Sequence, residues 1–231
     1  KRQLLTHHHI ILDGWSIPTL LDELMTLYRD GEAVSLPRTT SYRDYLAWLA
    51  ARDHEADRKA WAKSLAGLDE PTLIAPARTA RSILPSMLAE RLPQDRVALL
   101  SARARSLDVT LATVVQVAWG LVLAQTTGRD DVVFGITVSG RPATLDGVER
   151  MIGLFINTVP LRLRLYPGEQ IQSLLTRVHS EQTELLDHHH LQLADIQSAT
   201  GLGELFDTLV TYENYPLALQ SAVTQDLDTL S

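Results

Sequence analysis

The 231-residue sequence contains no cysteine. Disulfides, thiolate nucleophiles and zinc sites built on cysteine ligands are therefore excluded. The absence of cysteine also fits the reducing cytoplasm, where disulfides are rare, and we expect the protein to be cytoplasmic. Long hydrophobic runs are missing as well, because Gly, Thr or a charged residue interrupts each apolar stretch. We therefore expect no membrane span and no membrane partner.

Basic residues are also scarce, since 21 Lys and Arg stand against 28 Asp and Glu, for a formal net charge of -7. Phosphate binding needs a basic surface, so this balance argues against nucleic acid as a partner. The remaining composition, 45% hydrophobic and 21% charged, is that of an ordinary globular protein. Such a chain has enough apolar surface to fold, and we do not expect disorder.

Strand patterns and helix patterns alternate along the chain, which predicts an α/β layered fold. The β-branched run at residues 131–138 is typical of a buried strand. Residues 156–165 and 205–212 are predicted to form two later strands. Earlier in the chain, strand-like patterns cover residues 3–12 and 87–92.

Apolar residues spaced three and four apart predict helices between these strands. One begins after Ser16, which is placed to cap it, and stops at Asp30-Gly31. A long helix is predicted to start near residue 41 and to extend towards residue 65. Further helices are expected at residues 94–106, 110–123 and 169–186. The core stripe of the helix at 110–123 is predicted to consist of Leu111, Val114, Val115, Ala118 and Val122.

Three consecutive histidines, His7, His8 and His9, precede an Asp13-Gly14 turn. In a strand, His7 and His9 would share one face and His8 would point to the other, so the three cannot bind one metal together. With no carboxylate at ligand spacing nearby, we expect no metal there. Two interpretations remain open for these histidines. They are buried and satisfied by hydrogen bonds, or one of them projects into a cleft, where imidazole can hold or accept a proton near pH 7.

Other catalytic templates are missing from the sequence. Residues 135–140 contain glycine and serine at the wrong spacing for a nucleophile elbow, and no phosphate-binding glycine loop or dinucleotide fingerprint is present. We therefore expect no tightly bound cofactor. A second triplet, at residues 188–190, follows a predicted helix. It is interpreted as a solvated or capping cluster at a helix C-terminus, where imidazolium complements the helix dipole.

The segment His8-His9-x-x-x-Asp13-Gly14, continued by Trp15-Ser16, resembles the HHxxxDG motif of non-ribosomal peptide synthetase condensation domains. Other segments of this chain resemble the family's later motifs, in the family's order. They are the YxDY helix at residues 42–45 with Trp48, the SGRP loop at 139–142, the IGLFINT segment at 152–158, and the LFDT and ENYP segments at 205–208 and 213–216. Together these motifs cover nearly the whole chain. One departure is at residues 188–195, where the family often has HQDLPFE.

The resemblance implies a chloramphenicol-acetyltransferase-like α/β fold, with two-layer lobes and a mixed sheet. Against that template, residues 1–231 form a partial condensation domain, with the second lobe mostly present and the first lobe mostly missing. Residues 1–15 are then the motif strand and turn at the lobe junction. Residues 16–216 supply helices and the C-terminal lobe, and residues 217–231 are a weakly patterned tail.

The implied activity is that of an acyltransferase that forms amide bonds. The amine of an acceptor aminoacyl group attacks the thioester of a donor acyl or peptidyl group, and both groups are carried on the 4′-phosphopantetheine arms of carrier proteins. The substrate itself supplies the nucleophile, which is compatible with the absence of cysteine. The implied partners are donor and acceptor carrier domains, a neighbouring adenylation domain and the missing N-terminal lobe.

By the motif match, His9 is the residue expected to act on the amine, as a general base or as a hydrogen-bonding group that positions it. The sequence leaves these two roles open. His8, on the opposite strand face, is expected to support packing and orientation. Gly14 is expected to allow close approach of the backbone to substrate.

The resemblance also implies supporting residues around the motif. Asp13 is expected to be the family's structural aspartate and to pair with an arginine, for which Arg141 of the SGRP loop is the candidate. Ser16 is expected either to donate to the oxyanion or to cap the following helix. Trp15 and Asn157 are expected to shape the cleft.

Other functions share parts of this pattern. An epimerisation domain has the same HHxxxDG core, although the residues after Gly14 differ from its usual sequence. A free-standing CoA-dependent acyltransferase is a second alternative, but the SGRP and ENYP segments favour the synthetase branch. A non-catalytic recruitment domain of the same fold is a third, although such domains usually have a degraded motif.

Overall fold

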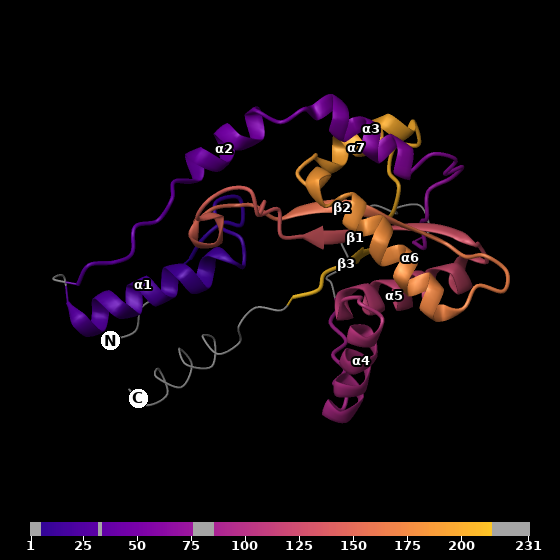
Figure 1. Ribbon diagram of the computed structural model, residues 1–231, viewed down its shortest axis with the longest axis horizontal. Helices are drawn as coiled ribbons and strands as arrows, with labels where there is room; N and C mark the ends of the chain where they lie inside the picture. The colour runs from indigo at the N-terminus through magenta and orange to yellow at the C-terminus, as the bar shows by residue number, and fades with distance from the viewer. Residues whose placement is uncertain (1–5, 32–33, 76–85, 214–231) are drawn as a thin grey trace. The chain divides into compact units, whose positions relative to one another are not determined.

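A computed structural model describes residues 6–31, 34–75 and 86–213 (Figure 1). The chain divides into two compact units, which are described separately. The motif unit comprises Lys1–Asp53, Ser139–Asn157 and Tyr212–Ser231, and the sheet unit comprises His54–Val138 and Thr158–Thr211.

The sheet unit is built on three strands, β1 (Asp131–Val138), β2 (Asn157–Arg164) and β3 (Leu209–Val210), in the order β2-β1-β3. Strand β3 runs parallel to β1, with Gly135 opposite Leu209. Five consecutive residues of the central strand β1, 132–136, are buried. This is the burial expected of a strand covered on both faces.

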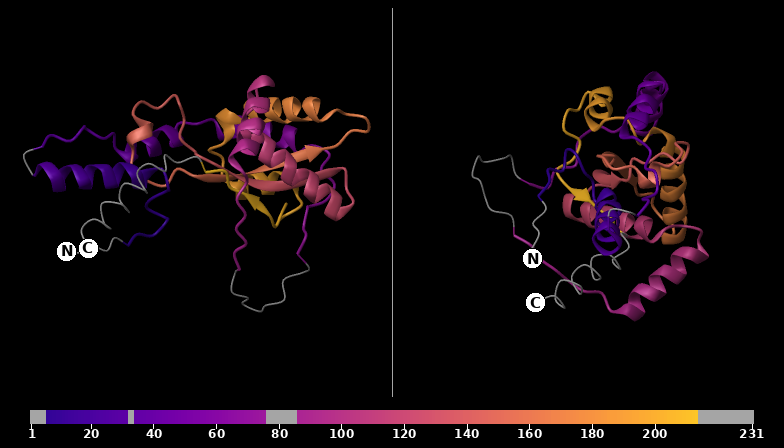
Figure 2. Two further views of the ribbon diagram at one scale, coloured as in Figure 1. Left: turned by 90° about the horizontal axis from the view of Figure 1, so that it is seen from below. Right: turned by 90° about the vertical axis from the view of Figure 1, so that its left-hand side faces the viewer.

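Five α-helices of the sheet unit are described: α3 (His54–Ser64), α4 (Gln94–Ser106), α5 (Leu111–Thr127), α6 (Ile171–Glu184) and α7 (Leu193–Thr200). Helix α5 packs against β1 and α6, and α3 packs against α7 (Figures 1 and 2). A short 3₁₀ helix, η2 (Leu186–His188), follows α6. The core between these elements includes Trp61, Phe134, Leu163 and Ile196, which are almost fully buried.

The motif unit contains α1 (Ser16–Asp30), α2 (Tyr42–Ala50) and the 3₁₀ helix η1 (Val148–Arg150). Its own small core consists of Tyr45, Val148, Met151 and Phe155. Three of these four residues come from the loop segment between β1 and β2. The motif unit therefore joins an early part of the chain to a segment more than a hundred residues later.

Several predicted elements are confirmed. Strand β1 has the predicted bounds, β2 lies within residues 156–165, and α4 spans the predicted residues 94–106. The pattern of α6 predicts Ile171, Leu174, Leu175 and Val178 on its inward face. The last three are buried, but Ile171, the first residue of the helix, is exposed. A small sheet flanked by helices agrees with the predicted α/β fold class.

The predicted first strand is wrong over its described part. Residues 9–11 form a turn, in which the N–H of Ile11 donates to the carbonyl of His8 at 3.1 Å, and Ile10 and Ile11 are exposed. A strand needs a neighbouring strand for its hydrogen bonds, and none of β1, β2 and β3 pairs with this segment. Residues 3–5 of the predicted strand and the predicted tail at 217–231 lie outside the described residues.

Two further strand predictions need correction. Residues 86–92 have no regular structure, and Met87 is 92% exposed. The last strand is reduced from residues 205–212 to Leu209–Val210, with an isolated bridge between Phe206 and Thr72 before it. In both places an apolar run without enough pairing partners does not become a long strand.

The predicted long helix is divided in two. Helix α2 ends at Ala50 and is capped by Ala51, whose N–H donates to the carbonyls of Ala47 and Trp48, and α3 begins at His54. The new N-terminus places Glu55 and Asp57 in the first turn of α3, where negative charge is favourable.

The core stripe predicted for α5 is also wrong in part. Val115, Ala118 and Val122 are exposed, and Leu111 and Val114 are only half-buried. The buried residues of the helix include Thr113, Gln116 and Gly120 instead. Helix α5 is apolar around most of its circumference, so periodicity alone did not select the buried face. Close packing selects it instead, because a Cβ on Gly120 would collide with the side chain of Leu163.

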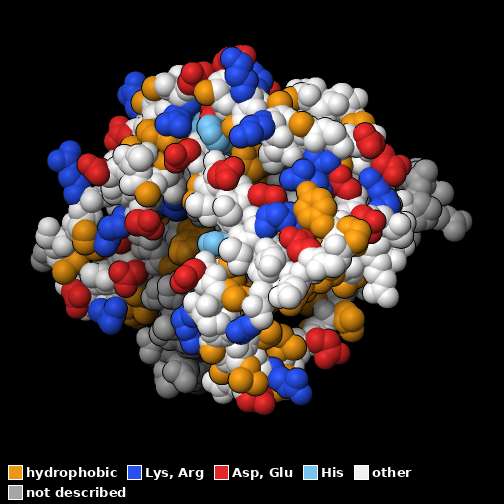
Figure 3. Space-filling view, turned by 45° about the vertical axis from the view of Figure 1, so that its right-hand side comes forward, with side chains coloured by type: hydrophobic (Ala, Val, Ile, Leu, Met, Phe, Trp, Pro, Cys, Tyr) orange, Lys and Arg blue, Asp and Glu red, His pale blue; other side chains and the backbone are white. Residues whose placement is uncertain are grey.

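Among the described residues, no single helix is long and apolar enough to cross a membrane. Only α4 and α5 taken together, with a bend of 102° between them, meet the length and composition of a broken span. One face of the protein shows basic and acidic side chains interspersed (Figure 3).

Candidate active site

Asp13, the acidic residue of the HHxxxDG motif, is completely buried in the motif unit. Its Oδ1 accepts hydrogen bonds from the backbone N–H of Ser16 at 2.9 Å and from the Ser16 hydroxyl at 2.8 Å. Its Oδ2 accepts from the backbone N–H of Phe155 at 3.1 Å. Its own N–H donates to the carbonyl of Gly153 at 3.0 Å. These bonds tie the motif turn to the segment around residues 153–155.

Arg141 completes the environment of this carboxylate. Its Nη2 lies 3.1 Å from Oδ1 and 3.4 Å from Oδ2 of Asp13, and its side chain is only 4% exposed. Nη1 donates to the carbonyl oxygens of Val148 and Met151. The guanidinium carbon lies 3.9 Å from the centre of the Phe155 ring, a cation–π contact. The ion pair expected between Asp13 and Arg141 is therefore present, within a dense set of hydrogen bonds.

The close approach around Arg141 depends on glycine. Gly140 has φ of +63°, in the left-handed region, and a Cβ there would collide with the backbone carbonyl of Phe155. Gly153 is also confined, because a Cβ there would collide with the ring of Tyr42. Only the absence of side chains at these two positions lets the SGRP loop and the 153–155 segment pack together.

Ser16 has a role that sequence reasoning missed. It is the first residue of α1 and Trp15 is the cap residue, so the prediction that Ser16 caps the helix is wrong. Its buried hydroxyl accepts from the Gly153 N–H at 3.0 Å and from Arg141 Nη2 at 3.1 Å, and it lies within hydrogen-bond distance of Asp13 Oδ1 and the Gly153 carbonyl. These contacts make Ser16 the link between the motif turn and both later segments.

Two tyrosines pack beside the ion pair. The Tyr42 hydroxyl donates to the carbonyl of Leu154 at 2.6 Å, and its ring meets that of Phe155 edge-on. Burial, followed by the charge of Asp13, raises the pKa of Tyr42. Burial and then the neighbouring Tyr42 raise the pKa of Tyr45 to about 12. Both phenols therefore stay protonated at neutral pH.

The two motif histidines lie at the protein surface. The His8 Nδ1 accepts from the backbone N–H of Ile10 at 3.1 Å, which fixes the turn. The ring of His9 contacts that of His7 edge-on, with 5.8 Å between the centres. His7 and His9 therefore share a side, as a strand would also have required, although the backbone is a turn. The described structure contradicts the interpretation in which these histidines are buried.

The remaining site predictions fall near this centre. Gly14 and Trp15 lie in the turn that leads into α1, and both are half-buried. Asn157 is half-buried at the start of β2, two residues after Phe155. The structure thus brings Asp13, Ser16 and Arg141 into direct contact.

Three contacting residues were missed from the sequence, although they lie in segments that resemble family motifs. Gly153 and Phe155 belong to the IGLFINT segment and Tyr42 to the YxDY helix. Their contacts are made across more than a hundred residues, so local patterning gave no signal of them.

The second histidine triplet, in the sheet unit, is not the solvated cluster predicted. His188 Nδ1 and His190 Nε2 each lie 2.7 Å from a different oxygen of the buried Asp57 carboxylate. The side chain of His190 is only 4% exposed. Burial, and then the neighbouring His188 and His190, lower the pKa of His189 to about 4, so this residue is neutral rather than an imidazolium at neutral pH.

Comparison with known proteins decides the family. Residues 2–231 match the family model described as the condensation domain. The chain belongs to the condensation domain family. Bacitracin synthase 3 of Bacillus licheniformis is 37% identical over 222 residues, which are 93% of this chain and 4% of that protein. Surfactin synthase subunit 3 of Bacillus subtilis (strain 168) is 35% identical over 217 residues, 92% of this chain and 17% of that protein.

Solved condensation domains have the same fold. The first condensation domain of the CDA synthetase superposes with a TM-score of 0.71 at 28% identity, over 88% of this chain and 46% of that one. A starter condensation domain of rhizomide synthetase, at 23% identity, has a TM-score of 0.72 over 91% of this chain and 50% of that one. The fold is therefore of the chloramphenicol-acetyltransferase-like condensation type, and the chain spans about half the length of the solved condensation-domain chains it matches.

Proposed function

We propose that this chain carries the motif-bearing part of a condensation domain that forms peptide bonds in non-ribosomal peptide synthesis. In this role residues 1–231 are a partial domain, with residues 1–15 at the junction to an N-terminal lobe. The observation that carries the proposal is the buried Asp13–Arg141 pair, which holds the intact HHxxxDG turn against the SGRP and IGLFINT segments. Membership of the condensation family supports the same function.

The reaction is an acyl transfer from sulfur to nitrogen. The neutral α-amine of the acceptor aminoacyl group attacks the thioester carbonyl of the donor. The new C–N bond forms, the C–S bond breaks, and the amine gives up one proton while the donor phosphopantetheine thiolate gains one. An α-amine has a pKa of about 7.7–8.0, so a useful fraction is neutral at pH 7 without an enzymatic nucleophile.

His9 is the residue we assign to the amine, as a general base or as a hydrogen-bonding group that positions it. Its exposure on the turn before Asp13 is compatible with access by substrate. A side chain that transfers or directs one proton typically contributes about 10²–10⁴-fold to a rate. His8 supports this arrangement by fixing the turn through the N–H of Ile10.

Most of the other motif residues hold the turn that carries His9 in place. Asp13 and Arg141 hold the turn, and Ser16 connects it to Gly153. Gly14 allows the backbone to approach substrate, and Trp15 and Asn157 shape the cleft. The substrates arrive on the 4′-phosphopantetheine arms of donor and acceptor carrier domains, beside an adenylation domain, and the synthesis is cytoplasmic. No tightly bound cofactor takes part in this chemistry.

The experiment is product analysis in a synthetase that contains this chain, with its donor and acceptor carrier domains loaded. Condensation gives a dipeptidyl group on the acceptor carrier. An epimerisation domain would instead give an inverted aminoacyl or peptidyl thioester with no new amide bond. A recruitment domain would give neither product, and either of these two outcomes would overturn the proposal.

A further inference from the structure

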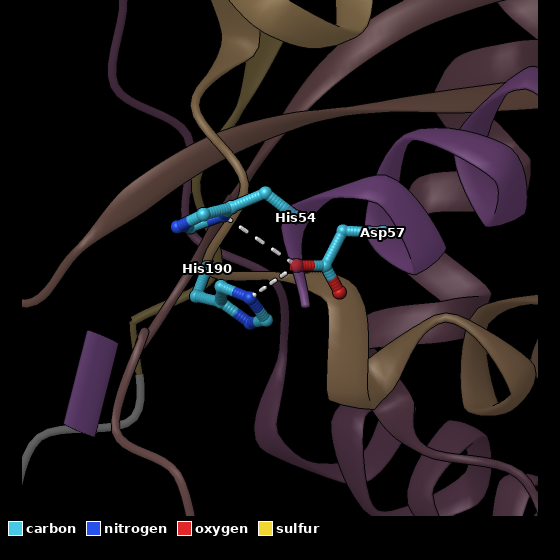
Figure 4. Close-up of side chains that lie close together, drawn as sticks. All are labelled: His54, Asp57 and His190. Carbon is cyan, nitrogen blue, oxygen red and sulfur yellow. Dashed lines mark hydrogen bonds and ion pairs between the residues drawn. The ribbon is translucent and has the colours of Figure 1, made fainter. Parts of the chain in front are cut away.

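The sheet unit contains a cluster of histidine and carboxylate side chains that the condensation reaction does not use. His54 and Asp57 lie at the start of α3, three positions apart, and therefore on the same side of the helix. His190 lies just after η2. Figure 4 shows the three side chains pointing towards one another. Oδ2 of Asp57 lies 2.7 Å from Nε2 of His190 and 3.7 Å from Nδ1 of His54. All three atoms lie within 4.8 Å of one another.

We propose that His54, Asp57 and His190 form a binding site for a divalent transition-metal ion, with Zn²⁺ as the preferred occupant. Two imidazole nitrogens and one carboxylate oxygen are a donor set that Zn²⁺ accepts. Mg²⁺ and Ca²⁺ prefer oxygen ligands and are disfavoured by two nitrogens. The proposal is independent of the condensation activity.

The spacing of the ligand atoms is close to what such an ion needs. Zinc–nitrogen and zinc–oxygen bonds of about 2.0–2.2 Å in a tetrahedron place neighbouring ligand atoms roughly 3.3–3.6 Å apart. The distance from Asp57 to His54 is already near this value, and that from Asp57 to His190 must open by less than about 1 Å. The imidazole of His54 is 43% exposed and has room to adjust.

The surroundings of Asp57 are those of a supported metal ligand. Its side chain is only 2% exposed, and its second oxygen, Oδ1, lies 2.7 Å from Nδ1 of His188. A carboxylate accepts only, so the His188 nitrogen donates and fixes the orientation of the carboxylate. The carbonyl of His188 in turn accepts from the indole N–H of Trp61, a residue of the main core, at 2.9 Å. This chain of contacts holds Oδ2 of Asp57 towards the other two ligands.

The burial pattern defines an entrance. Asp57 and His190 are almost fully enclosed, whereas His54 is partly exposed. An ion therefore enters from the His54 side, and a water molecule there completes a fourth position. Nε2 of His190 donates a hydrogen to Asp57 when no metal ion is bound, and it must lose this hydrogen before it can bind one. In a neutral imidazole, Nδ1 can carry the hydrogen instead.

The experiment measures Zn²⁺ binding to the 231-residue protein by calorimetry and by the melting temperature, with Co²⁺ as a spectroscopic probe of tetrahedral coordination and Mg²⁺ as a comparison ion. The exposed His7–His9 triplet is a competing source of metal binding. All measurements are therefore repeated in a background where His7, His8 and His9 are replaced by Gln. In the Gln background we expect one equivalent of Zn²⁺ that raises the melting temperature, the wild type is expected to retain this equivalent, and Mg²⁺ at the same concentration is expected to have no effect.

Substitutions assign the site. His54→Ala removes a partly exposed ligand with little risk to folding, and Asp57→Asn keeps the shape of the buried ligand. Each is expected to weaken Zn²⁺ binding about 10–100-fold or more, since even indirect partners of ligands have effects of this size. His179→Gln, on α6, is the matched histidine control and is expected to bind like the wild type. Binding that disappears with the His7–His9 replacement, or that survives His54→Ala unchanged, would overturn the proposal, as would the absence of any one-equivalent site.

Discussion

Asp13 and Arg141 stand 128 residues apart in the sequence and form a buried ion pair with a shortest distance of 3.1 Å. Their side chains are 0% and 4% exposed. The pair is further bound by Ser16, by the N–H of Phe155 and by the carbonyls of Val148 and Met151. Each charge thus has several partners, which is the condition under which a buried pair is tolerated.

Removing one partner should be costly. Arg141→Ala leaves the Asp13 carboxylate buried without its counter-charge, and we expect a loss of about 3–5 kcal/mol in the free energy of unfolding. Urea unfolding of the purified protein measures this loss. Arg150→Ala is the matched control, because its pair with Glu23 is 3.8 Å long and Arg150 is 46% exposed, and it should cost less than about 1 kcal/mol. Equal losses in the two variants would contradict the structural role of Arg141.

The hydroxyl of Ser16 should matter more than its position in a helix suggests. Ser16→Ala removes the hydroxyl that accepts from the Gly153 N–H and donates to Asp13 Oδ1, so both buried groups lose a hydrogen bond. We expect a loss of about 1–3 kcal/mol in the free energy of unfolding. Ser106→Ala removes an exposed hydroxyl bonded to the carbonyl of Arg103 and should change stability by less than about 0.5 kcal/mol. Thermal unfolding of both variants compares the two losses. A Ser16→Ala protein as stable as the wild type would refute the linking role.

The contact of Gly140 with Phe155 can be separated from its backbone conformation. Gly140 and Gly168 both have positive φ, +63° and +80°, but a Cβ on Gly168 meets nothing within 4 Å. Gly168→Ala should therefore cost only the left-handed strain, about 1–2 kcal/mol. Gly140→Ala adds a collision with the backbone carbonyl of Phe155, so its melting temperature should fall further. A lower melting temperature for Gly168→Ala than for Gly140→Ala would contradict the close approach of Gly140 to Phe155.

Alkaline pH should destabilise the motif unit through Tyr45. Burial raises its pKa in the folded protein to about 12, whereas an unfolded tyrosine has a pKa of about 10. Deprotonation therefore favours the unfolded state. The stability due to this shift is fully present below about pH 10 and is lost as the pH rises from about 10 towards 12. Tyr45→Phe should flatten the fall in melting temperature between about pH 9 and 11.5, and an unchanged slope would argue against the shift.

The sequence predicted those parts of the fold that a local pattern determines. Strand β1 is a buried β-branched run and was predicted with its observed bounds, and α4 likewise. Residues 3–12 have an equally apolar pattern, yet their described part is a turn. Local apolarity does not say whether a pairing strand is present, and pairing decides which apolar run becomes a strand.

The candidate site was predicted from motif resemblance rather than from periodicity. The resemblance identified Asp13 and Arg141 as a pair, and the structure contains it. The contribution of Ser16 and the enclosure by Gly153 and Tyr42 depend on three distant segments that meet in space. The contact of His188 and His190 with Asp57 was missed for the same reason, since Asp57 lies 131 residues before His188.

The central claim is that His9 acts on the acceptor amine while the Asp13–Arg141 pair only holds the turn. The direct measurement is the single-turnover rate of dipeptide formation on loaded carrier domains, for His9→Ala in a synthetase that contains this chain. His7→Gln, two residues earlier on the same exposed segment, is the matched control. We predict a fall of about 10²–10⁴-fold for His9→Ala, with a wild-type melting temperature and near-normal activity of the control. Wild-type product formation by a folded His9→Ala enzyme would contradict the account.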